Sequence, residues 1–275
     1  MFVVGSGNSS GTVLHRLVLD QLVVTTTRHS VEECAAGLHY HERPHLSLVL
    51  RGGDVEARAR ACTRREPGAL AFYPAGDVHG SVSRDAESIH ANVEFGPDFF
   101  DTIDVCADDV AARLARRHDA ALLVLRTQAE LCSGNTSHAA LAIEAIVVDL
   151  VTPRRSERAH PAWVDRVEEA LIDGWSERLS LSRLAAIGGV HPVTVSREFR
   201  RHVGTSLTAY LRRLRVSRSV PRITGGTTPL SQVAFEWGFA DQSHLTRAMR
   251  EETGFSPGAL RRLGAQTDRQ RRAPR

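Results

Sequence analysis

Lysine is absent from this 275-residue sequence, and arginine supplies all 35 of its strongly basic side chains. We interpret this absence as compositional drift rather than as a functional signal. Long hydrophobic runs are also missing: the longest candidate, residues 141–151, is short and contains Glu144 and Asp149, which excludes a membrane span. The N-terminal residues have neither a positive leader nor a long apolar stretch, so the sequence predicts a cytoplasmic protein without a signal peptide.

Cysteine is scarce and widely spaced. Cys34, Cys62, Cys106 and Cys132 form no C-x-x-C pair, so neither a disulfide framework nor a zinc ribbon is indicated. We expect buried free thiols in a reducing cytosol.

The charge is distributed unevenly along the chain. Residues 1–152 hold 13 Arg and 20 Asp or Glu, a formal charge of −7, whereas residues 153–275 hold 22 Arg and 12 Asp or Glu, a formal charge of +10. The second half is therefore the expected partner of a polyanion, and the first half is not.

The order of sequence patterns predicts an α+β chain with two domains. Residues 12–96 combine Val, Leu and Thr with alternating polar positions and turn signals, which is typical of a small sheet sandwich or barrel. Apolar residues then recur at helical spacing over 108–131 and 137–151. We expect these two helices to cover the sheet or to pair with a second subunit, and to complete a first domain at 12–151.

The rest of the chain predicts a linker, an all-helical domain and a tail. Residues 152–161 are charged and contain two prolines, which predicts a linker. Residues 162–263 show helical patterns separated by short Gly or Pro turns. The Arg-rich residues 264–275 predict a disordered basic tail.

One short pattern occurs twice in the helical domain. Residues 189–208, GVHPVTVSREFRRHVGTSLT, match residues 238–257, GFADQSHLTRAMREETGFSP, in the spacing of Arg, Gly and Ser. Each copy predicts a helix, a tight glycine turn and a second helix, the second one starting at Pro192 in the first copy and after Asp241 as N-cap in the second.

The second helix of each copy has one apolar and one polar face. Val195 and Phe199 are expected to point to the core in the first copy, as are Leu245, Ala248 and Met249 in the second. The opposite faces are small, polar and cationic. An α-helix fits the major groove of B-DNA, where Arg and Gln bond base edges, so the repeat and the positive charge together predict two DNA-reading helices.

Residues 162–263 resemble the DNA-binding domain of the AraC family of bacterial transcription regulators, most specifically in GFADQSHLTRAMREETGFSP. The resemblance implies two helix-turn-helix units joined by a long helix, here residues 207–223. Pro221 lies inside that joining helix and is expected to kink or end it. His191 stands where the family has a better N-cap, and Val193 can neither donate nor accept a hydrogen bond.

The resemblance also implies which side chains contact DNA. The implied base-reading residues are Val193, Ser196, Arg197, Gln242, Ser243, His244 and Arg247. The implied phosphate contacts are Arg200, Arg201 and Arg250, which position the protein without reading sequence.

Four histidines in the first domain form a second candidate site. His39 and His41 share one face of a predicted strand, and His45 has the same parity if Pro44 keeps the register. Residues 68–80, GALAFYPAGDVHG, then bring His79. The two segments resemble the two motifs of the cupin barrel, and the resemblance implies that these histidines meet inside it.

These histidines have two interpretations. They are pocket-lining or hydrogen-bonded core residues in a domain that binds an organic effector or none, or they hold a divalent metal, since neutral imidazoles suit zinc, iron, copper or nickel. We favour the first interpretation and expect no cofactor. By strand parity, Glu42 and Asp77 are expected to point away from the histidines.

The sequence therefore predicts a non-enzymatic, sequence-specific transcription regulator with a cupin-like sensing domain. The expected partners are double-stranded DNA, an unknown small-molecule effector, a second copy of the chain and, for an activator, RNA polymerase; a membrane is not among them. The alternatives are a metal-dependent cupin enzyme with a basic accessory domain, and an interaction protein with a degenerate DNA-binding domain.

Overall fold

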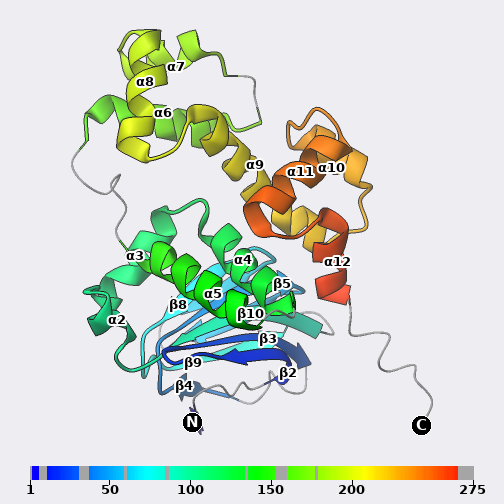
Figure 1. The fold of residues 1–275 in the computed structure, drawn as a ribbon. Coiled ribbons are helices and arrows are strands. Elements are labelled where there is room, and N and C mark those ends of the chain that lie inside the picture. Colours follow the sequence, from blue (N-terminus) through cyan, green and yellow to red (C-terminus); the bar gives the residue numbers. More distant parts are fainter. Residues whose placement is uncertain are drawn as a thin grey trace.

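The structure is a computed structural model with two parts, an N-terminal part of sheets and helices (residues 2–152) and a C-terminal helical part (residues 160–265) (Figure 1). The residues that it describes are 2–5, 11–30, 37–58, 61–83, 87–133, 136–152, 160–176 and 179–265. Most of the predicted linker and the predicted tail from residue 266 onward lie outside the described residues.

Two five-stranded sheets pack face to face in the N-terminal part. The first sheet has the order β1-β4-β9-β6-β7, and the second has the order β2-β3-β10-β5-β8. The strands of the first sheet are β1 (Phe2–Val4), β4 (His39–His41), β9 (His79–Ser83), β6 (Asp54–Arg58) and β7 (Ala61–Arg65). The strands of the second sheet are β2 (Thr12–Val18), β3 (Leu22–Ser30), β10 (Glu87–Phe95), β5 (His45–Arg51) and β8 (Leu70–Tyr73). The sheets are antiparallel except for the β1–β4 pair.

The hydrophobic core lies between the second sheet and helices, not between the two sheets. Alternate residues of β10, such as Ala91, Val93 and Phe95, are fully buried in this core. Their neighbours Ser88, His90 and Asn92 point to the first sheet instead, because successive side chains of a strand point to opposite faces. The space between the sheets is thus polar, and this decides where a ligand can bind.

In the described residues of the N-terminal part, four helices follow β10, where the sequence predicted two. They are α2 (Phe99–Thr102), α3 (Ala107–Arg116), α4 (Ala120–Cys132) and α5 (Thr136–Val151). The single helix predicted over 108–131 is wrong, since it is broken at residues 117–119. Arg117 is buried there, and its guanidinium pairs with Asp119 and Asp149. These ion pairs stabilise the non-helical backbone between α3 and α4.

The thiols do not follow the sequence-based expectation. Cys62, Cys106 and Cys132 are exposed, so the prediction of buried thiols is wrong for these three, and Cys34 lies outside the described residues. Cys132 occupies the last turn of α4 and Cys106 the N-cap of α3, where side chains face solvent.

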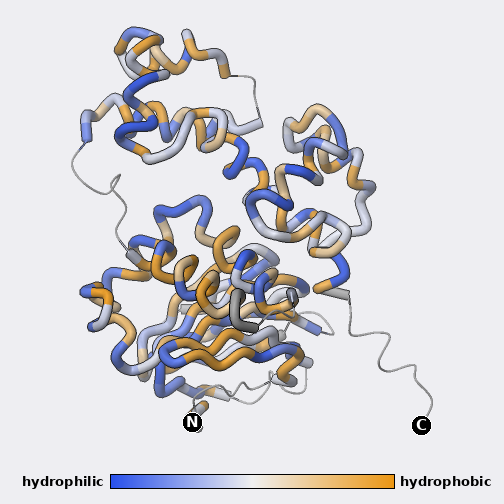
Figure 2. Tube along the Cα trace, in the orientation of Figure 1, coloured by the Kyte–Doolittle hydropathy of each residue, from blue (hydrophilic) through white to orange (hydrophobic). Residues whose placement is uncertain are grey.

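The C-terminal part contains two helix-turn-helix units joined by one long helix, α9 (Leu207–Thr224). The first unit consists of α6 (Ala162–Asp173), α7 (Leu181–Gly188) and α8 (Pro192–Val203). The second unit consists of α10 (Leu230–Glu236), α11 (Gln242–Thr253) and α12 (Pro257–Ala265). In Figure 2 the Arg-rich α9 is a hydrophilic segment between the units.

Helix α9 continues past Pro221, so the proline does not end it, and the alternative of a kink stays a prediction. The helix runs for three more residues, and the backbone N–H of Gly225 donates to the Pro221 carbonyl at 3.0 Å. The proline ring packs against Gly68 of the N-terminal part, where a Cβ would lie 2.8 Å from Pro221 Cγ. Burial of Val220 and Ile223 on the same turn stabilises the helix despite the missing hydrogen bond.

The two units differ in how they are buried. The second unit and the adjoining half of α9 share one continuous hydrophobic cluster with the N-terminal part, in which α11 packs on α4. The first unit has a separate cluster built around Trp163, Val195 and Phe199. The boundary between independent cores therefore lies within α9, not at the predicted linker.

Candidate nucleic-acid interface and histidine cluster

Helix α8 presents a polar face on the first unit. His191 is its N-cap, and His191 Nδ1 accepts a hydrogen bond from the backbone N–H of Val193 at 3.3 Å. Val195 and Phe199 are fully buried, which confirms their predicted inward orientation. The side chains that face solvent are Val193, Ser196, Arg197, Arg200 and Arg201.

Helix α11 presents a matching face on the second unit. Asp241 is the N-cap, and its Oδ1 accepts from the backbone N–H of His244 at 2.7 Å, as the sequence predicted. The inward orientation predicted for Leu245, Ala248 and Met249 is confirmed by their burial. The side chains that face solvent are Gln242, Ser243, His244, Arg247 and Arg250.

The polar face of α11 has a shallow hollow. One side chain on this face, His244, also contacts its own turn. The hollow is lined by Gln242, Ser243, Thr246, Arg247, Arg250 and Glu251. His244 Nδ1 accepts from the backbone N–H of Ala240 at 3.3 Å, and its ring packs edge-on against Phe239. His244 therefore also stabilises its own turn, which leaves only Nε2 of this ring to face a ligand.

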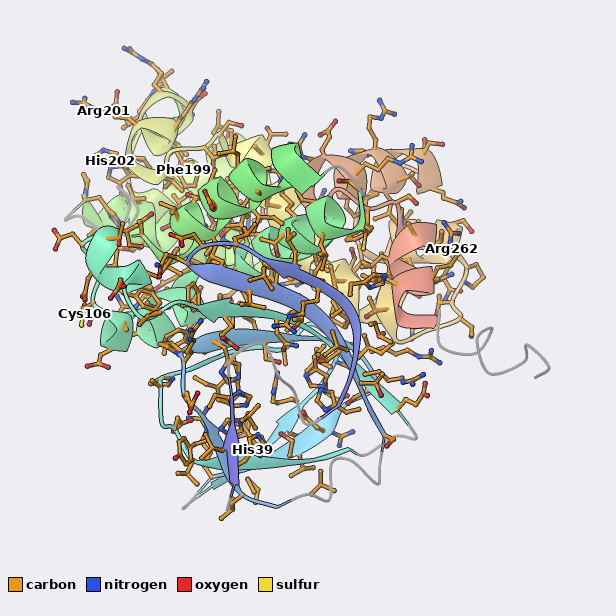
Figure 3. The ribbon with its side chains drawn as sticks, turned by 60° about the horizontal axis from the view of Figure 1, so that its bottom comes forward. His39, Cys106, Phe199, Arg201, His202 and Arg262 are labelled. Atoms are coloured by element: carbon orange, nitrogen blue, oxygen red, sulfur yellow. The ribbon has the colours of Figure 1, made fainter. Side chains whose placement is uncertain are left out.

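The four histidines of the N-terminal part converge as the sequence predicted. His39 pairs across the first sheet with His79, and their ring centroids are 4.6 Å apart. His45 enters from the second sheet, with its ring centroid 4.0 Å from that of His41. His39, His41 and His79 each offer one ring nitrogen within 4.8 Å of the other two. Figure 3 shows His39 among the strands, at the opposite end of the molecule from Arg201.

Burial keeps these imidazoles neutral. Desolvation, followed by repulsion from His79 and His39, lowers the pKa of His41 to about 3. Burial also lowers the pKa of His39 and His79, and it lowers that of His45 well below the ordinary value. Unprotonated rings are the form that ligates a metal or accepts a hydrogen bond.

Asp77 lies beside the histidines, so the prediction that it points away is wrong. Its carboxylate Oδ2 is 4.0 Å from His79 Nδ1, and its backbone oxygen is 2.9 Å from the same nitrogen. Asp77 lies in the turn before β9 rather than within a strand, so strand parity does not apply to it.

A second set of buried polar residues lies between the sheets beside the histidines, and no sequence pattern indicated it. Arg65 Nη1 donates to the Tyr73 hydroxyl at 2.7 Å, and Arg65 Nη2 donates to the Ser47 carbonyl at 3.1 Å. Asp54 lies 3.8 Å from Arg65 and 3.8 Å from His90. Each of these side chains is more than nine-tenths buried.

Two atoms of this set have no hydrogen-bond partner among the residues that the structure describes. Arg65 Nε is a buried donor, and Asp54 Oδ1 is a buried acceptor. Burial raises the pKa of Asp54 against the opposing effect of Arg65. An unsatisfied buried polar atom costs about 1–3 kcal/mol, so this pair of atoms is suited to a ligand that both accepts and donates hydrogen bonds.

Tyr73 links the two sets. Its ring stacks on His45 at 4.6 Å between centroids, and its hydroxyl donates to Glu56 Oε2. Burial alone would raise the pKa of Glu56, but the hydrogen bonds from Tyr73 and Arg58 lower it below the ordinary value. The histidines and the Arg65 set therefore line one continuous polar interior.

Comparison with known proteins identifies the C-terminal domain. Residues 184–263 match the family model described as a helix-turn-helix domain. The chain is 33% identical over 118 residues to the transcriptional activator RhrA of Rhizobium meliloti, covering 42% of this chain and 36% of that protein. It is also 28% identical over 83 residues to a putative AraC-like transcription regulator of Streptomyces antibioticus, covering 30% of this chain and 27% of that protein. Residues 184–263 form a helix-turn-helix domain.

The similarity covers only part of the length of each relative. The chain spans between about a quarter and about half of the length of the curated relatives it matches. It is 28% identical over 144 residues to the HTH-type transcriptional activator RhaS of Enterobacter sp., covering 50% of this chain and 52% of that protein. Among solved structures, the C-terminal domain of the response regulator AraT from Geobacillus stearothermophilus is 25% identical, with a TM-score of 0.35, over 38% of this chain and 87% of that domain.

The match to the helix-turn-helix family model includes both solvent-facing helices. It begins inside α7 and ends inside α12, so α8, α9 and α11 lie within it. The α6 helix precedes the matched residues although Val164 and Val167 of α6 belong to the same hydrophobic cluster as α7 and α8. None of the described helices is both long and apolar enough to cross a membrane.

Proposed function

We propose that this chain is a sequence-specific DNA-binding transcription regulator of the AraC type. The observation that supports this most directly is the pair of capped helices, α8 and α11, each with a buried apolar face and an exposed cationic face, inside the matched helix-turn-helix domain. The formal charge of +10 on residues 153–275 favours a polyanionic partner.

The proposed contacts divide into two classes. We assign base reading to Val193, Ser196, Arg197, Gln242, Ser243, His244 and Arg247, all on the first two turns of α8 or α11. We assign phosphate contacts to Arg200, Arg201 and Arg250, which lie further along the two helices and are exposed. The partial engagement of His244 with its own turn supports a smaller contribution from this residue than from Arg247.

The test is selection of bound fragments from genomic DNA by the purified full-length protein, followed by titration at several salt concentrations. We expect a defined motif, and an affinity that falls with salt by a log–log slope of about −0.9 per phosphate neutralised. Enrichment of no motif, together with an affinity insensitive to salt, would refute the proposal.

We further propose that the polar interior between the sheets binds the effector. A small organic ligand with a hydrogen-bond acceptor for Arg65 Nε and a donor for Asp54 Oδ1 fits the two unpartnered atoms. A divalent metal on His39, His41 and His79 is the second candidate, favoured by the 4.8 Å limit on the distances between their ligand atoms.

Elemental analysis and thermal shift separate the two candidates. An organic effector raises the Tm of the full chain, because binding to the folded state adds stability by mass action. The rise should be lost in Arg65→Met, while about one metal per chain that disappears in His41→Ala/His79→Ala identifies a metal site. Turnover of a substrate by the metal-loaded protein, without DNA binding, would favour the cupin enzyme instead.

A further inference from the structure

Two tryptophans stack between the helix-turn-helix units. Trp175 follows α6 of the first unit, and Trp237 follows α10 of the second. Their ring centroids are 4.6 Å apart and their planes are inclined by 22°, so the rings lie face to face. Such a pair is stabilised by the burial of both ring faces and by an offset geometry.

Two arginines of α9 hold the stack from the joining helix. Arg215 Nε donates to the Trp175 carbonyl at 2.9 Å, and Arg215 Nη1 donates to the Gly238 carbonyl at 2.9 Å. The Arg218 guanidinium lies 5.5 Å from the centroid of the Trp175 ring, in cation–π contact. One side chain of α9 therefore binds the backbone of both units next to the stacked rings.

The glycine beside Trp237 is required by this arrangement. Gly238 has φ of 71°, and a Cβ there would lie 2.9 Å from Arg215 Cζ. A larger residue would displace the guanidinium that bonds the two carbonyls. The turn that makes the second helix-turn-helix unit thus also accommodates the contact with the first.

The hydrophobic clusters of the two units are separate, so the units are joined by α9 itself and by contacts of this kind, which can set the angle between α8 and α11. We propose that Trp175, Trp237, Arg215 and Arg218, here called the tryptophan clamp, fix this angle and so select the spacing between the two DNA half-sites. The proposal rests on the proposed DNA-binding function.

The N-terminal part also touches α9, from residues 118 and 119. The His118 ring lies 4.2 Å from the Tyr210 ring, and Asp119 lies 4.0 Å from Arg213. These contacts join the N-terminal part to α9, whereas the tryptophan clamp joins the two units directly. Tests in the full chain leave the contacts of His118 and Asp119 in place.

The first test measures the angle without DNA. Spin labels at Ser196 of α8 and Ser243 of α11, in a full-length chain whose native cysteines are changed to serine, report one inter-unit distance by pulsed EPR. We expect a narrow distance distribution that broadens in Trp237→Ala and in Arg218→Ala. Trp237→Phe should keep it narrow, because the ring face is retained.

The matched control for Arg218→Ala is Arg222→Ala. Arg222 lies one turn further along α9 and is also exposed, so its substitution removes the same charge. Its guanidinium lies 3.9 Å from Glu236 and not against either tryptophan. Equal widths in the parent, Trp237→Ala and Arg218→Ala would overturn the proposal. Equal broadening in Arg222→Ala would also overturn it, because a general loss of charge would then be the cause.

The second test uses the DNA motif selected by the parent protein, with one base pair inserted or removed between its two halves. Each base pair moves one half-site by about 3.4 Å along the axis, so the parent should discriminate strongly against both altered sites. Trp175→Ala should reduce this discrimination by about two- to tenfold, the range expected for loss of an aromatic pair.

The outcomes separate the two proposals. Unchanged discrimination in Trp175→Ala, with intact DNA binding, overturns the tryptophan clamp and leaves the proposed function standing. Absence of specific DNA binding in the parent overturns the proposed function, and the pulsed EPR distances then still decide whether the tryptophans fix the angle.

Discussion

Individual charged residues distinguish the interior between the two sheets from an ordinary protein core. Arg65 exposes only 5% of its surface, yet its guanidinium has contacts with Tyr73, Ser47 and the carboxylates of Asp54 and Glu56. Charged groups are expensive to bury unless they are paired. Such a set, with one donor and one acceptor unpartnered among the described residues, supports the proposal that this interior binds a polar ligand.

The buried histidines make the stability of the protein depend on pH. Their folded-state pKa values lie below the unfolded value of about 6.5, so only the unfolded state takes up protons as the pH falls from 6.5. We expect stability to decrease between pH 7.5 and 5, by up to about 1.4 kcal/mol per pH unit for each histidine that stays neutral.

Denaturant unfolding at several pH values checks this dependence. The buried carboxylates do not produce this decrease: the pKa of Glu56 is lowered, away from that window, and the raised pKa of Asp54 would make stability rise as the pH falls. His41→Gln/His79→Gln should flatten the pH dependence. The same slope in the parent and the double variant would contradict the assignment.

Arg247 and Arg201 should differ in what their loss does to DNA binding. Arg247→Ala should cost about 1–3 kcal/mol on the selected motif and relax the preference at one base position. Arg201→Ala should weaken binding to all sequences about equally, because this exposed side chain is assigned to phosphate. Competition assays with motif and random DNA measure both; uniform losses in both variants would mean that the wrong face of α11 has been assigned.

The sequence allowed the histidine cluster to be predicted but not the charged set beside it. His39, His41 and His79 belong to spaced motifs, whereas Asp54 and Glu56 alternate with Val55 and Ala57 in β6, a pattern that normally places the charges in solvent. The structure has the opposite orientation, with both carboxylates buried. Their shared partner Arg65, which is opposite Asp54 on the neighbouring strand, makes that orientation tolerable together with the hydrogen bonds that Glu56 accepts from Tyr73 and Arg58.

At the scale of single helices, the sequence predicted a helix end correctly where the contact that fixes it joins residues close together in the chain. The N-cap of α11 could be predicted because Asp241 and His244 are three residues apart. The break between α3 and α4 could not, because it depends on Asp149, which pairs with Arg117 from α5. Continuation of α9 past Pro221 likewise accompanies tertiary contacts, namely the burial of Val220 and Ile223 and the packing of the proline ring on Gly68.

Removal of the α11 N-cap should destabilise the protein measurably. Asp241→Ala should lower the free energy of unfolding by about 0.5–2 kcal/mol, since the backbone N–H of His244 loses its acceptor. Asp241→Asn keeps an acceptor oxygen and should cost much less. Urea denaturation of the full chain compares them, and equal losses in the two variants would show that charge rather than capping is responsible.

At the scale of the whole molecule, the N-terminal part and the second helix-turn-helix unit share one core. Helix α4 packs on α11, and a Cβ at Gly254, just after α11, would lie 2.5 Å from Ala129 Cβ. The first unit ends α8 in the same way at Gly204, where a Cβ would meet nothing within 4 Å. Both glycines have a left-handed backbone conformation, with φ of 76° at Gly254 and 80° at Gly204.

This pair of glycines provides a direct measure of the contact between the two parts. Gly204→Ala should cost about 1–2 kcal/mol from backbone strain alone. Gly254→Ala should cost about 1–3 kcal/mol more, because its methyl group overlaps Ala129. Thermal and denaturant unfolding give both values; equal costs would contradict close packing of α4 on the end of α11.

The shared core also determines how this protein can be recombined with others. A chimaera joined within residues 152–161 would give the C-terminal part a foreign N-terminal part while removing β5 and α4, which pack on α9 and α11. The apolar surface so uncovered promotes aggregation. A functional graft therefore needs a donor that supplies an equivalent covering surface, or a crossover inside α9 that transfers the second unit together with the N-terminal part.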